Sequence, residues 1–215
     1  MAASLLPPGG QHFAGTDRFG RDMFSRILVG VQTSVLATLS LVLIITLVGT
    51  IMGVLCGYYG GVLDAVVMRI SDICLAFPGL VFALAIAALL NGGLQNAVLA
   101  LAVISWPKYA RIARSQTLAQ KSTCYISAAK LAGNTSWQSI IRHILPNCAG
   151  PIVVTAMLDI GTMLMELAGL SFLGLGAQPP TAELGNMMSG AEVCSRHIHG
   201  SLLARELPYL LLWLF

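Results

Sequence analysis

Long uncharged runs separated by short polar stretches dominate the chain, and they predict helices that cross a membrane. The run 34–57 contains no charged residue over 24 positions, and a hydrocarbon core needs about 20 apolar residues. Because its apolar residues are continuous rather than alternating, helices are favoured over the strands of a membrane barrel. Residues 34–57 therefore form the first predicted span.

Three further spans are predicted at residues 73–90, 94–114 and 149–170. The second contains Pro78 near its start, where a proline either kinks a helix or marks its beginning. In the third, the apolar run ends before Pro107, and we expect the helix to continue past this residue with its cationic side chains reaching the lipid headgroups. The chain ends with LPYLLLWLF, which is too short to span.

Glycines recur at every fourth position of the first predicted span, at Gly49, Gly53 and Gly57. This spacing forms a smooth strip along one helix face, where another helix could approach closely. The alternative is that these glycines reflect only the high glycine content of membrane helices.

Composition changes the picture by excluding a soluble enzyme. Of the 215 residues, 56% are hydrophobic and 10% are charged, whereas soluble domains carry about 25% charged residues. Lipid must replace water over much of the surface, which predicts an all-α, polytopic membrane helical bundle. The net charge of +3 is too small an excess to indicate a nucleic-acid partner.

Candidate catalytic and metal-binding groups are scattered along the chain. No nucleophile and base are paired and no GxxxxGK[ST] phosphate loop is present, so we expect neither an enzyme nor a cofactor. The five cysteines show no CxxC spacing, which favours buried thiols over a disulfide framework or metal cage. The four histidines form no ligand set, and we expect no metal role for His197 and His199.

Half of the Lys and Arg residues fall within residues 107–147, which contain no Asp or Glu. The positive-inside rule places this loop in the cytoplasm. Parity then places the turn 91–93 outside and the loop 58–72 inside, where its charges suit an interfacial helix. The residues before Ser34 and after Leu170 lie outside.

The cytoplasmic loop predicts two short helices. Residues 125–131 favour a helix, Gly133 and Asn134 interrupt it, and residues 136–145 form a second helix that Pro146 stops. Two short helices that meet at a glycine make a compact surface that a soluble partner could bind.

The sequence YISAAKLAGNTSWQSIIRHILPN in this loop resembles the coupling motif of ABC-importer permeases. The resemblance implies a type I ABC-importer permease fold, with the coupling loop 119–147 docked into a groove of a separate ATPase. Small side chains allow close approach, and glycine permits the turn. Ser127 stands where the family usually has Glu. The coupling residues that the resemblance implies are Ser127, Ala128, Ala129, Gly133 and Pro146.

Residues 12–30, 57–78 and 171–176 resemble the dipeptide, oligopeptide and nickel branch of that family. Residues 158–176 look more like the nickel-type second permease subunit. The resemblance implies import of nickel, a metal chelate, or di- or oligopeptides across the bacterial inner membrane. It also implies four kinds of partner: membrane lipid, a second permease subunit, two cytoplasmic ATP-binding subunits and an external solute-binding protein.

The resemblance also suggests a domain organisation. Residues 1–33 are expected to be an external or interfacial segment, 34–190 the permease domain, and 191–215 a divergent ending. Permeases of this branch have more spans than the four predicted here, which indicates a chain shortened at both ends.

Two carboxylates lie within the fourth predicted span, on one helix face with two threonines. Charged groups in a span are costly and usually face a cavity or a partner. One hypothesis is that this face lines the translocation path and favours a cationic substrate. The alternative pairs Asp159 at the subunit interface and places Glu166 near the outer headgroups. The four path candidates are Thr155, Asp159, Thr162 and Glu166.

Charges of both signs precede the first span, at Asp17, Arg18, Arg21 and Asp22. They predict either an ion-paired external cap or a solvated interfacial helix. For the whole chain, the hypotheses that compete with an importer subunit are a stand-alone secondary carrier or channel and a non-functional permease remnant.

Overall fold

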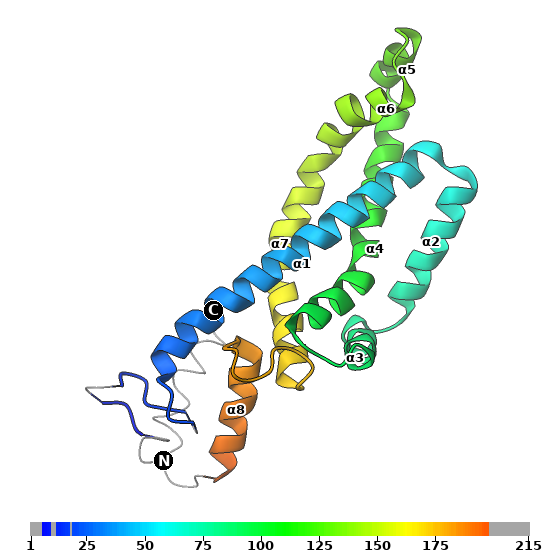
Figure 1. Ribbon diagram of the computed structural model, residues 1–215. Helices are drawn as coiled ribbons and strands as arrows, with labels where there is room; N and C mark the ends of the chain where they lie inside the picture. The colour runs from blue at the N-terminus through cyan, green and yellow to red at the C-terminus, as the bar shows by residue number, and fades with distance from the viewer. Residues whose placement is uncertain (1–5, 10–11, 18, 198–215) are drawn as a thin grey trace. The chain divides into compact units, whose positions relative to one another are not determined.

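A computed structural model describes residues 6–9, 12–17 and 19–197, and most of them are helical (Figure 1). In this part of the chain no strand forms, and one isolated bridge joins Thr16 to Asp22. The all-α prediction is therefore confirmed. The elements are α1 (Met23–Tyr59), α2 (Gly61–Ala76), α3 (Gly79–Leu89), α4 (Leu94–Lys121), α5 (Cys124–Leu131), α6 (Ser136–Ser139), the π-helical turn η1 (Ile140–Ile144), α7 (Leu145–Phe172) and α8 (Leu184–His197).

The chain divides into two compact units, and the helices α1, α3, α4 and α7 each contribute to both. The described residues of the first unit fall within Met1–Ala37, Ala87–Ala97 and Leu164–Phe215. The second unit comprises Thr38–Ile86 and Val98–Met163. The second unit therefore contains the whole coupling segment and most of α4.

Two helices in the described residues are long and apolar enough to cross a membrane, Met23–Tyr59 and Ser136–Phe172. A third span is present if the bent pair α2 and α3 counts as one. All four predicted spans fall largely on helices, but α4 does not meet the same criterion of length and composition. Cationic residues in its second half lower its mean hydropathy.

Helices α2 and α3 meet at an angle of 96° (Figure 1). Phe77 is extended, with φ −102° and ψ 149°, because the ring of Pro78 disfavours helical geometry at the residue before it. Pro78 therefore separates two helices rather than kinking one. The segment preceding it is helical from Gly61 onward, as its charges suggested.

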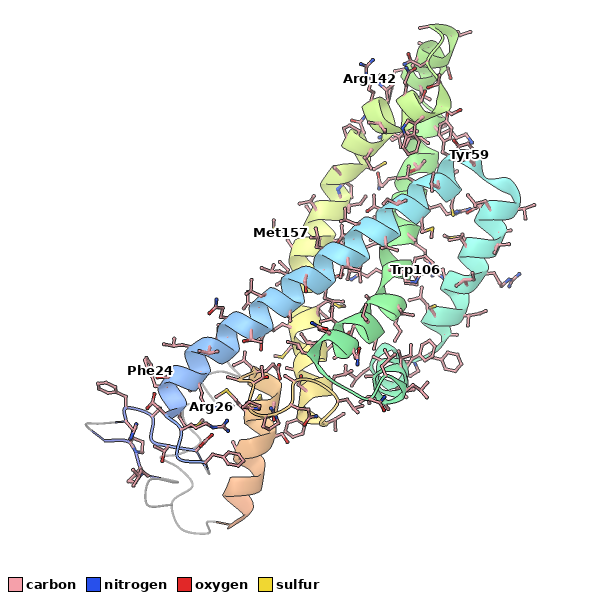
Figure 2. The ribbon with its side chains drawn as sticks, viewed as in Figure 1. Phe24, Arg26, Tyr59, Trp106, Arg142 and Met157 are labelled. Carbon is pink, nitrogen blue, oxygen red and sulfur yellow. The ribbon has the colours of Figure 1, made fainter. Side chains whose placement is uncertain are left out.

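The glycine strip of α1 packs directly on α4, as its spacing predicts. A Cβ atom added at Gly49 would lie 2.6 Å from the carbonyl oxygen of Trp106, which Figure 2 labels on α4. One added at Gly57 would lie 2.7 Å from the Cβ of Thr117. Only glycine permits these two backbones to approach so closely.

Two prolines lie inside long helices, Pro107 in α4 and Pro151 in α7. The prediction that the helix continues past Pro107 is confirmed. The prediction that Pro146 stops a helix is wrong, because α6, η1 and α7 form one helical stretch, Ser136–Phe172. The wider π-helical turn just before Pro146 moves the hydrogen-bonding pattern by one residue, which accommodates a residue that has no N–H.

Candidate functional site

The predicted coupling loop, residues 119–147, contains the short helices α5, α6 and η1, which form a compact helical turn that we call the knuckle. Gly133 has φ +86°, a left-handed conformation that glycine adopts without strain, and it ends α5 there. The N–H of Asn134 donates to the carbonyl of Ala129 at 3.1 Å. Thr135 then caps α6: its hydroxyl accepts from the N–H of Gln138 at 3.3 Å, and the Gln138 side chain accepts from the N–H of Thr135 at 2.9 Å.

Polar side chains from the two ends of the coupling motif hold the knuckle together. Asn147 donates its side-chain N–H to the Tyr125 hydroxyl at 3.0 Å, and this hydroxyl donates to the side-chain oxygen of Gln120 at 2.5 Å. The Tyr125 ring meets the His143 ring edge-on, with centroids 6.2 Å apart. Sequence reasoning missed these residues, although a tyrosine and an asparagine that bracket the motif were a visible signal.

The predicted coupling residues lie on the outside of this knuckle. Ser127, Ala128, Gly133 and Pro146 are exposed, and Ala129 is half-buried. Two large apolar side chains accompany them: Leu131 is 91% exposed and Trp137 is 60% exposed. Arg142 also projects outward from η1 (Figure 2). We call the exposed set Ser127, Ala128, Leu131, Gly133 and Trp137 the coupling surface.

Asp159, the first carboxylate of the predicted path, is buried and charge-paired within the chain. It is 4% exposed, and the Lys108 ammonium donates to its two oxygens at 2.6 Å and 2.9 Å. The fully buried Tyr109 donates its hydroxyl to the same carboxylate at 3.0 Å. Its partners are thus on α4 of the same chain.

The other path candidates are more accessible than Asp159. Thr162 is exposed, and Thr155 is half-buried, with its hydroxyl donating to the Pro151 carbonyl of its own helix at 2.8 Å. Glu166 is half-buried in the part of α7 that belongs to the first unit. The structure brings together Asp159, Lys108 and Tyr109, of which the sequence singled out only Asp159 as a path residue.

Three further cations of α4 contact other helices of the second unit. The Arg111 guanidinium lies 2.6 Å from a carboxylate oxygen of Asp72. Arg114 binds both oxygens of Asp64, at 2.5 Å and 2.6 Å. Lys121 donates to the carbonyl of Tyr58 at 2.6 Å. Acids on α2 and a helix-end carbonyl on α1 therefore bind these three side chains. The expectation that Lys108, Arg111 and Arg114 reach the lipid headgroups stays a prediction.

The segment before α1 is an ion-paired loop rather than an interfacial helix. The Arg21 side chain binds Asp17 at 2.8 Å, and His12 lies 3.1 Å from Asp22. Burial tends to raise the pKa of the Asp17 carboxyl, but hydrogen bonds from Arg21 and Phe19 outweigh it and hold that pKa below its usual value. Arg18, which belonged to the same prediction, lies outside the described residues.

Asp22 anchors the start of α1. Ser25 donates its hydroxyl and its N–H to the Asp22 carboxylate at 2.7 Å and 2.8 Å, which is the hydrogen bonding of a helix N-cap. These bonds, and a weaker one with His12, lower the pKa of Asp22. An aspartate thus keeps its charge at the positive end of the helix dipole.

A buried carboxylate that sequence reasoning missed fastens α8 to α1 within the first unit. Glu183 is 0% exposed, and its oxygens accept from the Ser34 hydroxyl at 3.3 Å and from the N–H of Asn186 at 3.0 Å. Gly30 faces the same place, since an added Cβ would lie 3.2 Å from the Met187 sulfur. The sequence TAELG looked like an ordinary external segment, and nothing local marks this glutamate as buried.

The cysteines follow their prediction in part. Cys56 and Cys148 are buried, as predicted, whereas Cys124 is exposed. Within the described residues, no group of three His, Cys, Asp or Glu side chains is arranged to hold a metal ion. His199 and the His197 side chain lie outside the described part of the chain.

Long apolar helices and the absence of strands in the described residues are typical of a helical membrane protein. Residues 49–212 match the family described as binding-protein-dependent transport system inner membrane component. The chain belongs to this family, and its predicted location in the inner membrane is confirmed with it.

Curated relatives match most of the chain. It is 48% identical over 189 residues to the probable D,D-dipeptide transport system permease protein of Escherichia coli K12. It is 44% identical over 184 residues to a glutathione transport system permease protein of Pectobacterium atrosepticum, and 43% identical over 195 residues to a dipeptide transport system permease protein of Haemophilus influenzae. These matches cover 86–88% of this chain, and the chain spans 61–66% of the length of these relatives.

Proposed function

We propose that the chain acts as the transmembrane permease subunit of an ATP-driven importer for di- or oligopeptides. The observation that carries this proposal is the similarity, over 86–88% of the chain, to permeases whose names specify a D,D-dipeptide, glutathione and a dipeptide. These names favour peptides over the nickel and metal chelates suggested by residues 158–176. The subunit itself binds no ATP in this proposal and performs no chemical step.

The proposed importer contains a second permease subunit, two cytoplasmic ATP-binding subunits and an external solute-binding protein. The coupling surface supports docking of an ATP-binding subunit. Large exposed apolar side chains on a folded surface are typical anchors of protein interfaces. On the coupling surface, Leu131 is 91% exposed and Trp137 is 60% exposed. The small side chains of Ser127 and Ala128 beside them leave room for a partner helix or groove.

A pair of matched substitutions tests this docking. Leu131→Asp puts a charge on the coupling surface, whereas Phe13→Asp changes a phenylalanine that is 80% exposed and lies in the segment before Ser34 that is predicted to be external. We expect L131D to reduce co-purification of the ATP-binding subunit and ATP-driven peptide uptake by at least about tenfold, because a charge buried in an interface is costly. F13D should retain both. Equal recovery of the ATP-binding subunit with the two variants would contradict the proposal.

We also propose that the face of α7 carrying Thr155, Asp159 and Thr162 borders the translocation path, with Glu166 further along the same face. The support is a buried charge within an apolar helix next to an exposed and a half-exposed threonine. Glu166 is half-buried. Because Asp159 is already paired with Lys108, this face presents no bare carboxylate at that position.

A further inference from the structure

In the ion pair between Lys108 and Asp159 of the second unit, the acid is buried and the base is exposed. The Lys108 ammonium contacts both oxygens of Asp159. The Asp159 side chain is 6% exposed, whereas the Lys108 side chain is 50% exposed. A solute that approaches this pair therefore meets a cation, although the pair as a whole is neutral.

The neighbouring pairs on α4 lack this asymmetry. In the pair of Arg111 with Asp72, the two side chains are 48% and 54% exposed, so that an approaching solute meets both charges. In the pair of Arg114 with Asp64, the values are 33% and 19%, and the guanidinium is occupied by both carboxylate oxygens. Among these three pairs, only Lys108 presents an accessible cation over a concealed anion.

The buried Asp159 carboxylate and its partner Tyr109 fix the position of the Lys108 ammonium. Asp159 accepts a third hydrogen bond from the fully buried Tyr109, at 3.0 Å, which holds the carboxylate in place. If the lysine swung away, a buried carboxylate would lose its countercharge, which is strongly unfavourable. An ammonium has three N–H donors, and the two bonds to Asp159 use two of them.

We propose that Lys108 is a subsite for an anionic group of the transported solute, the carboxylate of a short peptide. An ammonium binds a carboxylate through a charge-assisted hydrogen bond, and ionisable groups in apolar helices commonly mark substrate pathways. The subsite rests on the proposed function of peptide import and adds its chemical preference. It reverses the sign expected from Asp159 alone, which suggested a cationic substrate.

The test uses the complete importer in proteoliposomes with its solute-binding protein and ATP. Uptake is measured for a dipeptide and for its C-terminal amide, and the result is the ratio of the two rates. The same binding protein serves every variant, so its own preference cancels when ratios are compared. The variants are D159N, the double variant K108Q/D159N, and the matched control R111Q/D72N.

Asp159→Asn keeps the cation and removes its countercharge, so the preference for the free carboxylate should rise. K108Q/D159N removes both charges but keeps polar side chains of similar size, and the preference should fall by about tenfold, as expected for loss of one charged hydrogen bond. The control R111Q/D72N, which removes the exposed pair between Arg111 on the same helix and Asp72 on α2, should leave the ratio unchanged.

An unchanged or lower ratio in D159N would overturn the subsite, and so would an unchanged ratio in the double variant. If the double variant does not assemble, the uptake ratio of D159N alone tests the subsite. A different outcome would defeat the proposed function itself: wild-type importer that takes up neither peptide when binding protein, ATP-binding subunits and ATP are all present. Uptake of both peptides with unaltered ratios would defeat the subsite only.

Discussion

Substituting Gly53 should separate α1 from α4. A Cβ atom at this position would lie 2.7 Å from the Cβ of Ala113 and would clash with the carbonyl oxygen of Ala110. Neither atom belongs to a flexible side chain, so the helices must move apart. Such overpacking costs about 1–3 kcal/mol, and the better helix propensity of alanine offsets up to about 1 kcal/mol of it. Gly53→Ala should therefore lower the free energy of unfolding by up to about 2 kcal/mol, and by about 1–3 kcal/mol relative to a glycine-to-alanine change that meets no neighbour.

The matched control is Gly161→Ala in α7, where an added Cβ meets nothing within 4 Å. This change should leave stability unaltered or raise it by up to about 1 kcal/mol, because alanine favours the helix. Both variants are to be unfolded in mixed detergent micelles of increasing denaturing-detergent fraction, followed by circular dichroism. If G53A proves as stable as G161A, the reasoning is refuted, since α1 and α4 would then not be in contact at the glycine strip.

Three further changes address other parts of the chain. Gly133→Val puts a β-branched residue at φ +86°, at a cost of about 1–2 kcal/mol; uptake by membrane vesicles should fall while the amount of inserted chain stays constant, and unchanged uptake would speak against a coupling role. Because the pKa of Asp17 is lowered from its usual value in the folded loop, its charge stabilises the loop at neutral pH, and this stabilisation is lost as the pH falls through the pKa of the folded state. Hydrogen exchange in the loop, corrected for intrinsic rates, should therefore accelerate below about pH 4 in the wild type and already at pH 7 in D17N. Glu183→Ala removes the buried acceptor of the Ser34 hydroxyl and should lower the free energy of unfolding by about 1–3 kcal/mol in a thermal unfolding experiment. Glu183→Gln keeps an acceptor oxygen and should lose less of this free energy.

Helix positions and the glycine contact were predictable because both depend on local pattern. Continuous apolar runs favour helices wherever they occur, and glycines at every fourth position of 34–57 leave one helix face without side chains. A second helix can use such a face whatever its own sequence. The break between the two short helices was likewise predictable, because the chain forms its turn locally at Gly133.

The partners of the α4 cations were not predictable from the same kind of pattern. Lysine and arginine near the end of an apolar run are equally compatible with lipid headgroups and with ion pairs. The acids that bind Lys108 and Arg111 lie 51 and 39 residues away in sequence. Only the packing of the helices determines which acid each cation meets. For the same reason, nothing in the local sequence separates the buried Glu183 from a solvated glutamate.

The π-helical turn η1 sets how the coupling surface is rotated around the axis of α7. The N–H of Leu145 donates to the carbonyl of Ile140, a bond that encloses one residue more than an α-helical bond. Removing that extra residue would rotate everything before the turn by about 100° around the axis of α7 and shift it by about 1.5 Å. The number of residues in this turn therefore sets the direction in which Leu131 and Trp137 face relative to α7.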